Sequence, residues 1–292
     1  MSETLLLPVD GSPASAHAVR LLCSWRGEPA RIAPVVFNVQ QWPMSLWPHP
    51  MPDPGAIESA LLEEGAKDVE SARAVLASAG LAPEVAVRLG VPAQAIVDEA
   101  IRRGATAIVM GTRGRHGLAA LGSVATRVAH ASTLPTLLVR PGARLPAEFG
   151  RRLRVLVPVD GSEHARRAAE RLAGWRAWLG DIVVDILHVQ QPLTILETLL
   201  PPHQEALKQW GGQAAEQVAQ GAIGVFAAAG ITHHLHFSVG TPAEQVARLA
   251  ADLGSDLVMM GTRGLGAAHH ALIGSVALRT LEQADVPVVL VP

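Results

Sequence analysis

The segment Asp256–Ser275 reads DLVMMGTRGLGAAHHALIGS and joins three patterns in one short stretch. An apolar run ends at Gly261, a glycine-rich loop follows, and the residues from Ser275 onward, SVALRTLEQA, have the spacing of an amphipathic helix. The four glycines between Gly261 and Gly274 suit neither a helix interior nor a strand, because glycine loses the most backbone freedom on folding. A strand, a loop and a helix in succession form the unit from which parallel α/β sheets are built.

The same unit occurs earlier in the chain, as AIVMGTRGRHGLAALGS over residues 107–123, within a repeat of the whole sequence. LLLPVDGS pairs with VLVPVDGS, FNVQQ with LHVQQ, and GVPAQAIVDEA with GTPAEQVARLA. Landmarks before the loop are 150 residues apart, as Asp10 and Asp160 are, whereas Gly122 and Gly274 are 152 apart. We therefore predict two domains, about 1–145 and 149–292, and the loop of the first is two residues shorter.

Each half alternates short apolar runs with longer amphipathic segments. In the second half the runs are RVLVPVD, IVVDILHV, THHLHFSVG, DLVMMG and VPVVLVP, with helical patterns between them. Apolar strands separated by helices indicate a parallel sheet covered on both faces. Because crossover connections are right-handed, the predicted fold class is α/β, with two doubly wound, Rossmann-like domains. Each would have five parallel strands in the order 3-2-1-4-5.

In such a sheet, ligands bind beyond the carboxyl ends of the strands, where the winding direction reverses between the first and fourth strands. Asp160 ends the first apolar run of the second half and Gly261 ends the fourth, so both would flank one crevice. Ser275 fits the N-cap of the next helix, and free amides at a helix start favour an anion. The loop therefore suits a phosphate cradle, although a Walker A sequence is absent. The alternatives are that the glycines only shape a turn and that Asp160 only caps a helix.

Composition narrows the function classes. The chain of 292 residues has 49% hydrophobic residues, 17% charged residues and a net charge of -2, which is typical of a soluble globular protein. Near-neutral charge argues against nucleic acid as a partner, because phosphate binding needs clustered positive charge. The N-terminal residues do not have the pattern of a signal peptide, and no stretch reaches the roughly 18 apolar residues of a membrane helix. We expect a cytoplasmic location and no membrane partner.

Other side chains suggest alternatives that the sequence leaves open. His234 and His236 fall on one face of a predicted strand, so a metal site is an alternative to a solvated edge strand. No acidic or cysteine ligand is close to them in sequence, and we predict no metal site formed by protein ligands. G-x-S-x-G, H-E-x-x-H and carboxylates paired at catalytic spacing are absent, so we predict no catalytic residue.

The combined motifs resemble those of the universal stress protein family. They are PVDGS after the first strand, HV at the end of the second, and G-x2-G-x9-G-S after the fourth, and the resemblance covers both halves. It implies a tandem member with parallel five-stranded α/β domains that pair through their fifth strands. It also implies a cytoplasmic stress-response protein that binds ATP, with Mg²⁺ accompanying the phosphates. Association of two such chains into a homodimer is a further possibility.

The resemblance also implies site residues. In the second half, Pro158 and Asp160 would lie near the adenosine, and the main chain of Val189 would contact adenine. The ribose and phosphates would be held by Gly261, Gly264, Gly274 and Ser275. The residues of the first half that match by type are Pro8, Asp10, Val39, Gly111, Gly114, Gly122 and Ser123.

The first half departs from the family pattern in its loop. Its spacer RHGLAAL has seven residues where the pattern has nine. We therefore expect the first domain to bind ATP more weakly than the second, or not at all. A slow ATPase or nucleotidyl-transfer enzyme, and a nucleotide-free interaction scaffold, are the alternative functions.

Overall fold

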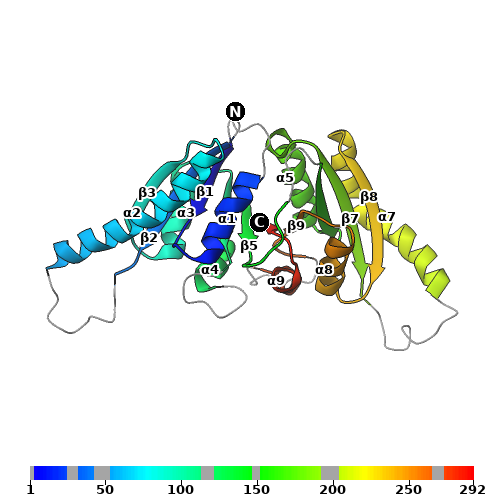
Figure 1. Cartoon of the computed structure of the whole chain (residues 1–292). Helices are drawn as coiled ribbons and strands as arrows, with labels where there is room; N and C mark the ends of the chain where they lie inside the picture. The colour runs from blue at the N-terminus through cyan, green and yellow to red at the C-terminus, as the bar shows by residue number, and fades with distance from the viewer. Residues whose placement is uncertain are drawn as a thin grey trace. The chain divides into compact units, whose positions relative to one another are not determined.

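The computed structural model of the chain describes residues 3–24, 32–42, 53–112, 122–146, 152–191, 204–264 and 273–292. The chain divides into two compact units, Met1–Pro141 and Gly142–Pro292. Figure 1 shows that each unit is a sheet with helices on its two faces. Among the described residues, no helix combines the length and the apolar character that a membrane crossing requires.

Unit 1 alternates strands and helices as predicted. Its elements are β1 (Glu3–Pro8), α1 (Pro13–Ser24), β2 (Ile32–Gln40), α2 (Pro54–Ser78), β3 (Glu84–Leu89), α3 (Pro92–Arg102), β4 (Ala107–Gly111), α4 (Ser123–Ala131) and β5 (Thr136–Val139). The strands are parallel and lie in the order β3-β2-β1-β4-β5.

Unit 2 repeats this plan. Its elements are β6 (Leu153–Val159), α5 (Glu163–Leu179), β7 (Ile182–Gln190), α7 (Gln204–Ala228), β8 (Thr232–Val239), α8 (Pro242–Asp252), β9 (Leu257–Gly261), α9 (Ser275–Gln283) and β10 (Val288–Val291). The strands are again parallel, in the order β8-β7-β6-β9-β10. Both orders equal the predicted 3-2-1-4-5, so the predicted fold class is confirmed.

The winding direction decides which helices cover which face. In unit 2, α5 packs against α7 and α8 packs against α9. Helices α5 and α7 belong to the connections from β6 to β7 and from β7 to β8, which run along the sheet in one direction. Helices α8 and α9 belong to the connections from β8 to β9 and from β9 to β10, which run in the opposite direction. Because crossovers are right-handed, the two pairs lie on opposite faces of the sheet. The crevice therefore opens between β6 and β9. Apolar side chains of β6 and β9 are buried at this place, with Val157, Val258 and Met259 at 0% exposure.

Strand register is the same in the two units. Pro8 pairs with Phe37 as Pro158 pairs with Leu187, and Gly111 pairs with Val139 as Gly261 pairs with Val291. Residues 150 positions apart before the glycine loop, and 152 apart after it, therefore occupy equivalent places at the carboxyl edge of each sheet.

Candidate functional site

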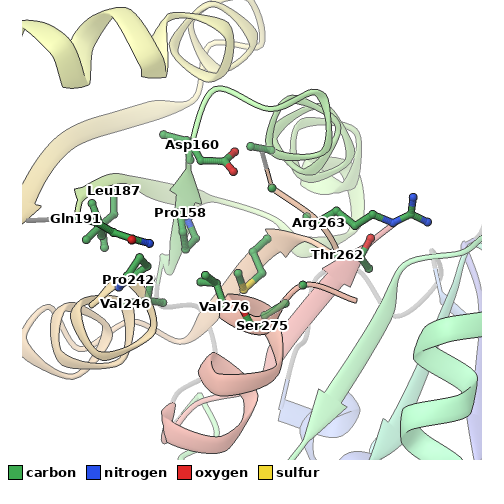
Figure 2. A pocket seen from close by; sticks show the side chains of 18 residues that line it. Pro158, Asp160, Leu187, Gln191, Pro242, Val246, Thr262, Arg263, Ser275 and Val276 are labelled. Atoms are coloured by element: carbon green, nitrogen blue, oxygen red, sulfur yellow. The ribbon is translucent and has the colours of Figure 1, made fainter. Parts of the chain in front are cut away.

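A cavity of about 460 Å³ lies at the carboxyl ends of β6, β7 and β9 in unit 2 (Figure 2). This volume falls within the range of roughly 300–1,000 Å³ that is usual for small-molecule sites. Every site residue predicted for the second half lines the cavity. These residues are Pro158, Asp160, Val189, Gly261, Gly264, Gly274 and Ser275. The fold thus brings together side chains that are more than 100 positions apart in sequence.

Asp160 lies at the carboxyl end of β6 and holds the turn that follows. Its Oδ1 accepts a hydrogen bond from the backbone N–H of Ser162 at 3.0 Å. Ser162, and not Asp160, is the N-cap of α5, because its side chain accepts a hydrogen bond from Ala165 N at 3.2 Å. Figure 2 shows the carboxylate of Asp160 directed across the crevice, towards the segment that leaves β9. The turn uses one carboxylate oxygen, and the other faces that segment.

Two glycines that follow β9 have different structural causes. A Cβ on Gly261 would lie 2.7 Å from Cβ of His164, so glycine is required there for the close packing of α5 on β9. A Cβ on Gly264 would instead lie 2.2 Å from Oδ2 of Asp160. The interpretation that glycines only shape the chain therefore applies to Gly261. Gly264 leaves room for the carboxylate across the crevice.

The glycine loop is closed by the same hydrogen bond in both units. Gly274 N donates to Thr262 O at 2.7 Å, and Gly122 N donates to Thr112 O at 2.6 Å. These bonds enclose residues 263–273 in unit 2 and 113–121 in unit 1, so the two-residue difference lies wholly inside the closed loop. Gly114, a predicted site residue, lies outside the described residues.

Helix α9 begins at the crevice, so the backbone amides of its first turn lie at the cavity. Its N-cap is Gly274, which has no side chain to accept a hydrogen bond from the first-turn amides. The prediction that Ser275 is the N-cap is wrong, because Ser275 is already the first helical residue. Ser275 is exposed and lines the cavity. Uncapped amides at a helix start carry partial positive charge and bind anions.

An apolar wall completes the cavity, and the sequence interpretation missed most of it. Leu187 on β7, Pro242 and Val246 on α8, Met260 on β9 and Val276 on α9 form this wall. The repeated sequences GVPAQAIVDEA and GTPAEQVARLA were the available signal for α8, because each follows a third strand and so begins at the carboxyl edge.

The end of β7 carries the HV pair of the sequence motif. The ladder between β6 and β7 ends at Val159 and His188, so Val189 lies one residue beyond it, at the cavity. His188 is buried, and its Nδ1 donates to Val159 O at 3.0 Å. The hydrogen bond from this histidine therefore ties the last residue of β6 to β7. Gln191, two residues further on, also lines the cavity.

Charge at the site is sparse. Asp160 and Arg263 are the ionisable side chains among the described residues that line the cavity. Figure 2 shows the guanidinium of Arg263 pointing away from Asp160 and Pro158. Burial lowers the pKa of His164, behind Gly261, and the positive charges of Arg167 and Arg263 lower it further, while Asp160 acts in the opposite sense.

Within the described ranges, no group of three or more histidine, cysteine, aspartate or glutamate side chains is arranged to hold a metal ion. His236 of the predicted histidine strand instead bonds to Asp185, with its Nε2 2.7 Å from Oδ1. His233 Nδ1 lies 2.9 Å from Ile231 O. His233 and His236 on β8 thus each have a structural partner.

Unit 1 places its matching residues in the same way. Asp10 Oδ1 accepts a hydrogen bond from Ser12 N at 3.0 Å, and a Cβ on Gly111 would lie 2.6 Å from the backbone carbon of Ala14. Gly122 is the N-cap of α4, and Ser123 is its first helical residue. Pro8 is the last residue of β1 and Val39 is the last but one of β2, at the register positions of Pro158 and Val189.

Comparison with known proteins agrees with this architecture. Residues 1–140 and 152–292 each match the universal stress protein family. The "universal stress protein in QAH/OAS sulfhydrylase 3′ region" of Thermus aquaticus is 34% identical over 139 residues, which cover 47% of this chain and 96% of that protein. A universal stress protein of Mycolicibacterium smegmatis is 32% identical over 139 residues, which cover 47% of each protein.

A solved structure extends the likeness to the whole chain. The crystal structure of a universal stress protein from Archaeoglobus fulgidus DSM 4304 covers 99% of this chain and 98% of its own, with a TM-score of 0.69. At 22% identity, this similarity shows a shared fold. Because the family match occurs twice and spans nearly the whole sequence, the chain belongs to the universal stress protein family and carries two of its repeats in tandem.

Proposed function

We propose that the chain is an ATP-binding module whose principal site is the crevice of unit 2. One observation carries the proposal: the carboxylate of Asp160 and the uncapped start of α9 line the same apolar-walled cavity. A carboxylate accepts hydrogen bonds from a nucleoside, a helix start binds phosphate, and an apolar wall accepts a base. A nucleotide is the ligand that needs all three.

Each part of the cavity then has a role. Leu187, Val189 and Val246 would contact the base, and Asp160 would accept a hydrogen bond from a hydroxyl or amino group of the nucleoside. The first amides of α9 and the hydroxyl of Ser275 would donate to the phosphates. Mg²⁺ would be held by phosphate oxygens and water, since Asp160 is the only carboxylate among the described lining residues.

We propose ATP binding, and not ATP hydrolysis, as the function of this cavity. A hydrolase needs a general base within hydrogen-bond reach of the attacking water. Asp160 is the only described lining residue that could serve, and its Oδ1 is already bonded to Ser162 N. We propose that ATP occupancy tunes the conformation or partner choice of a stress-response protein. ATP retained with very slow turnover supports this, and phosphate release well above background would favour the ATPase alternative.

Substitution of the carboxylate tests the site. We expect Asp160→Asn to weaken ATP binding to the full-length chain by about 10-fold, because one hydrogen bond to a charged acceptor contributes about 1.5–3 kcal/mol. Isothermal titration calorimetry with Mg-ATP gives the affinity. Asp10→Asn is the matched control, because Asp10 holds the equivalent turn in unit 1. Equal Kd values for the wild type and Asp160→Asn would exclude the assignment.

Two related predictions concern the whole chain. Unit 1 should bind ATP more weakly than unit 2, since its closed loop is two residues shorter. Pairing of the two domains through their fifth strands, and association of two chains, stay predictions. Mass spectrometry of the freshly purified, denatured protein will show whether adenine nucleotide is retained.

A further inference from the structure

Unit 1 has a cluster of arginines around a buried glutamate at the place where α3 packs beside β3. Glu99 on α3 is 2% exposed. Three guanidinium groups surround its carboxylate, from Arg88, Arg102 and Arg103. Arg88 Nε lies 3.2 Å from Oε2, Arg103 Nε lies 2.9 Å from Oε1, and Arg102 donates to both oxygens. Arg103 also pairs with Glu84 on β3.

The equivalent surface of unit 2 does not repeat this cluster. The residues of unit 2 that correspond to Glu84, Arg88, Glu99, Arg102 and Arg103 are His234, Ser238, Leu249, Asp252 and Leu253. The fold therefore forms without these charges, and the cluster is a property of unit 1 that the architecture does not require.

The cluster carries surplus positive charge at the surface. Burial by itself raises the pKa of Glu99, but the hydrogen bonds and charges of the surrounding arginines outweigh it and hold the pKa below its usual value. Three guanidinium groups against the carboxylates of Glu99 and Glu84 leave one net positive charge. The Arg88 side chain is 50% exposed and contacts Glu99 through Nε, so its two terminal nitrogens are donors for an outside acceptor.

These arginines lie beside an open backbone edge. β3 is last in the strand order of unit 1 and pairs with β2 on one side. At its end, Gly90 N donates to Gln40 O of β2 at 3.0 Å. Because backbone groups alternate in direction along a strand, those of Val85, Val87 and Leu89 point away from β2. Within the described ranges, no other strand pairs with β3 on that side.

This edge lacks the features that usually prevent strand addition. The sequence of β3, EVAVRL, contains neither proline nor lysine. Its two charged side chains, Glu84 and Arg88, are paired with residues of the arginine cluster. On the opposite face of the strand, Val85 is 44% exposed, and Val91 just beyond the strand is 56% exposed. The edge therefore presents unpaired backbone groups between a positive face and an apolar face.

We propose that the free edge of β3 is a docking surface for an acidic peptide segment of a partner protein, which adds to the sheet as a further strand. The backbone groups of Val85, Val87 and Leu89 would bond to the peptide. Side chains of a strand alternate between faces, so a peptide that alternates acidic and apolar residues would meet Arg88 on one face and Val85 on the other. A nucleic acid is a poorer match, because its binding needs more positive charge than the one net charge of this cluster. The proposed ATP site lies in unit 2 and is not needed for this inference.

Fluorescence anisotropy with the full-length chain tests the docking. The probe is a fluorescein-labelled peptide of about eight residues, the length of an ordinary strand, that alternates glutamate with valine. It should bind at least about 10-fold more tightly than a peptide that alternates lysine with valine, and than the acidic peptide with N-methyl groups on alternate amides. No binding of the acidic peptide, or equal binding of the acidic and basic peptides, overturns the inference. Equal binding of the methylated and unmethylated peptides contradicts strand addition.

A variant that copies unit 2 tests the arginines. Arg88→Ser, Glu99→Leu, Arg102→Asp and Arg103→Leu together give unit 1 a combination that already packs in this fold. This variant should bind the acidic peptide at least about 10-fold more weakly than the wild type. Arg88→Ser alone leaves Glu99 in place and should weaken binding about 3-fold, as expected for an exposed charge pair. Arg73→Ser, which removes an exposed arginine from α2, is the control and should leave binding unchanged.

Hydrogen exchange locates the bound peptide. With the acidic peptide present, the backbone amides of Val85, Val87 and Leu89 should exchange more slowly, whereas those of β8, at the edge of unit 2, should be unaffected. Unchanged affinity in the fourfold variant, or slower exchange at β8 and not at β3, overturns the inference.

Discussion

Gly264→Val is expected to weaken ATP binding at unit 2 by about 100-fold or more while the fold is retained. The backbone at Gly264 is not in the left-handed region, so valine causes no backbone strain there. The obstacle is Asp160, whose Oδ2 lies 2.2 Å from the position of the new Cβ. The carboxylate must move, and the branched side chain fills the space that it leaves. Losing one charged hydrogen bond accounts for about 10-fold, and the steric block adds to it.

Two controls separate this effect from a general loss of structure. Gly174→Val adds the same side chain in the same unit, on an exposed face of α5 where no atom lies within 4 Å of the new Cβ. It should leave ATP affinity unchanged. In an Asp160→Ala background, Gly264→Val has no carboxylate to displace, so it should weaken ATP binding less than it does in the wild type. The effects of the two substitutions on the free energy of ATP binding should therefore be less than additive. Strict additivity, or an unchanged affinity in Gly264→Val, would contradict the proposed geometry.

The fold could be predicted from the sequence because its deciding features are local or repeated. Strand type follows from apolar runs such as the one that ends at Gly261, and the order follows from right-handed crossovers between parallel strands. Asp160 and Gly261 were predicted to flank one crevice because the winding direction reverses between the first and fourth strands. Residues 154–162 and 256–264 lie about 100 positions apart, and topology alone joins them.

The features that the sequence analysis predicted wrongly or missed depend on atomic packing. Ser275 has the composition of an N-cap, yet Gly274 takes that place because its N–H closes the loop on Thr262 O. Gly261 is a glycine because α5 packs against it, which no local pattern reveals. Pro242 and Val246 line the cavity because α8 starts beside β7, and that contact depends on where the helix packs.

The sequence analysis also did not predict a buried ion cluster in unit 2. Asp185 interrupts the apolar run of β7 and is fully buried. Arg154 on β6 donates to both carboxylate oxygens, with Nε at 2.5 Å from Oδ2 and Nη2 at 3.0 Å from Oδ1. His236 on β8 adds a contact at 2.7 Å. The three residues come from three neighbouring strands, so only the register brings them together.

Asp185→Val is expected to lower the free energy of unfolding of unit 2 by about 3–5 kcal/mol. Removing one partner of a buried ion pair leaves the other charge without compensation, and this usually costs more than removing both. Chemical denaturation of the full-length chain, followed by the fluorescence of Trp175 and Trp178 on α5 of unit 2, measures the change. The single variant should unfold at a clearly lower denaturant concentration than the wild type.

Unit 1 supplies the matched control for this substitution. At the positions equivalent to Arg154, Asp185 and His236 it has Thr4, Val35 and Ala86. The triple variant Arg154→Thr, Asp185→Val, His236→Ala therefore copies a combination that already packs in this fold. It should recover most of the stability lost in Asp185→Val. If the triple variant is less stable than the single variant, the ion cluster is not the cause of the loss.

Acid should distinguish the wild type from the triple variant in a defined direction. Burial by itself raises the pKa of Asp185, but the hydrogen bonds from Arg154 and His236 outweigh it and hold the pKa below its usual value. A carboxyl group with a lowered folded-state pKa stabilises the fold above its unfolded pKa, about 3.9, and loses this contribution as the pH falls through the folded value. The stability of the wild type should therefore decrease more steeply than that of the triple variant below about pH 4. Parallel decreases would show that Asp185 is not held ionised by its two partners.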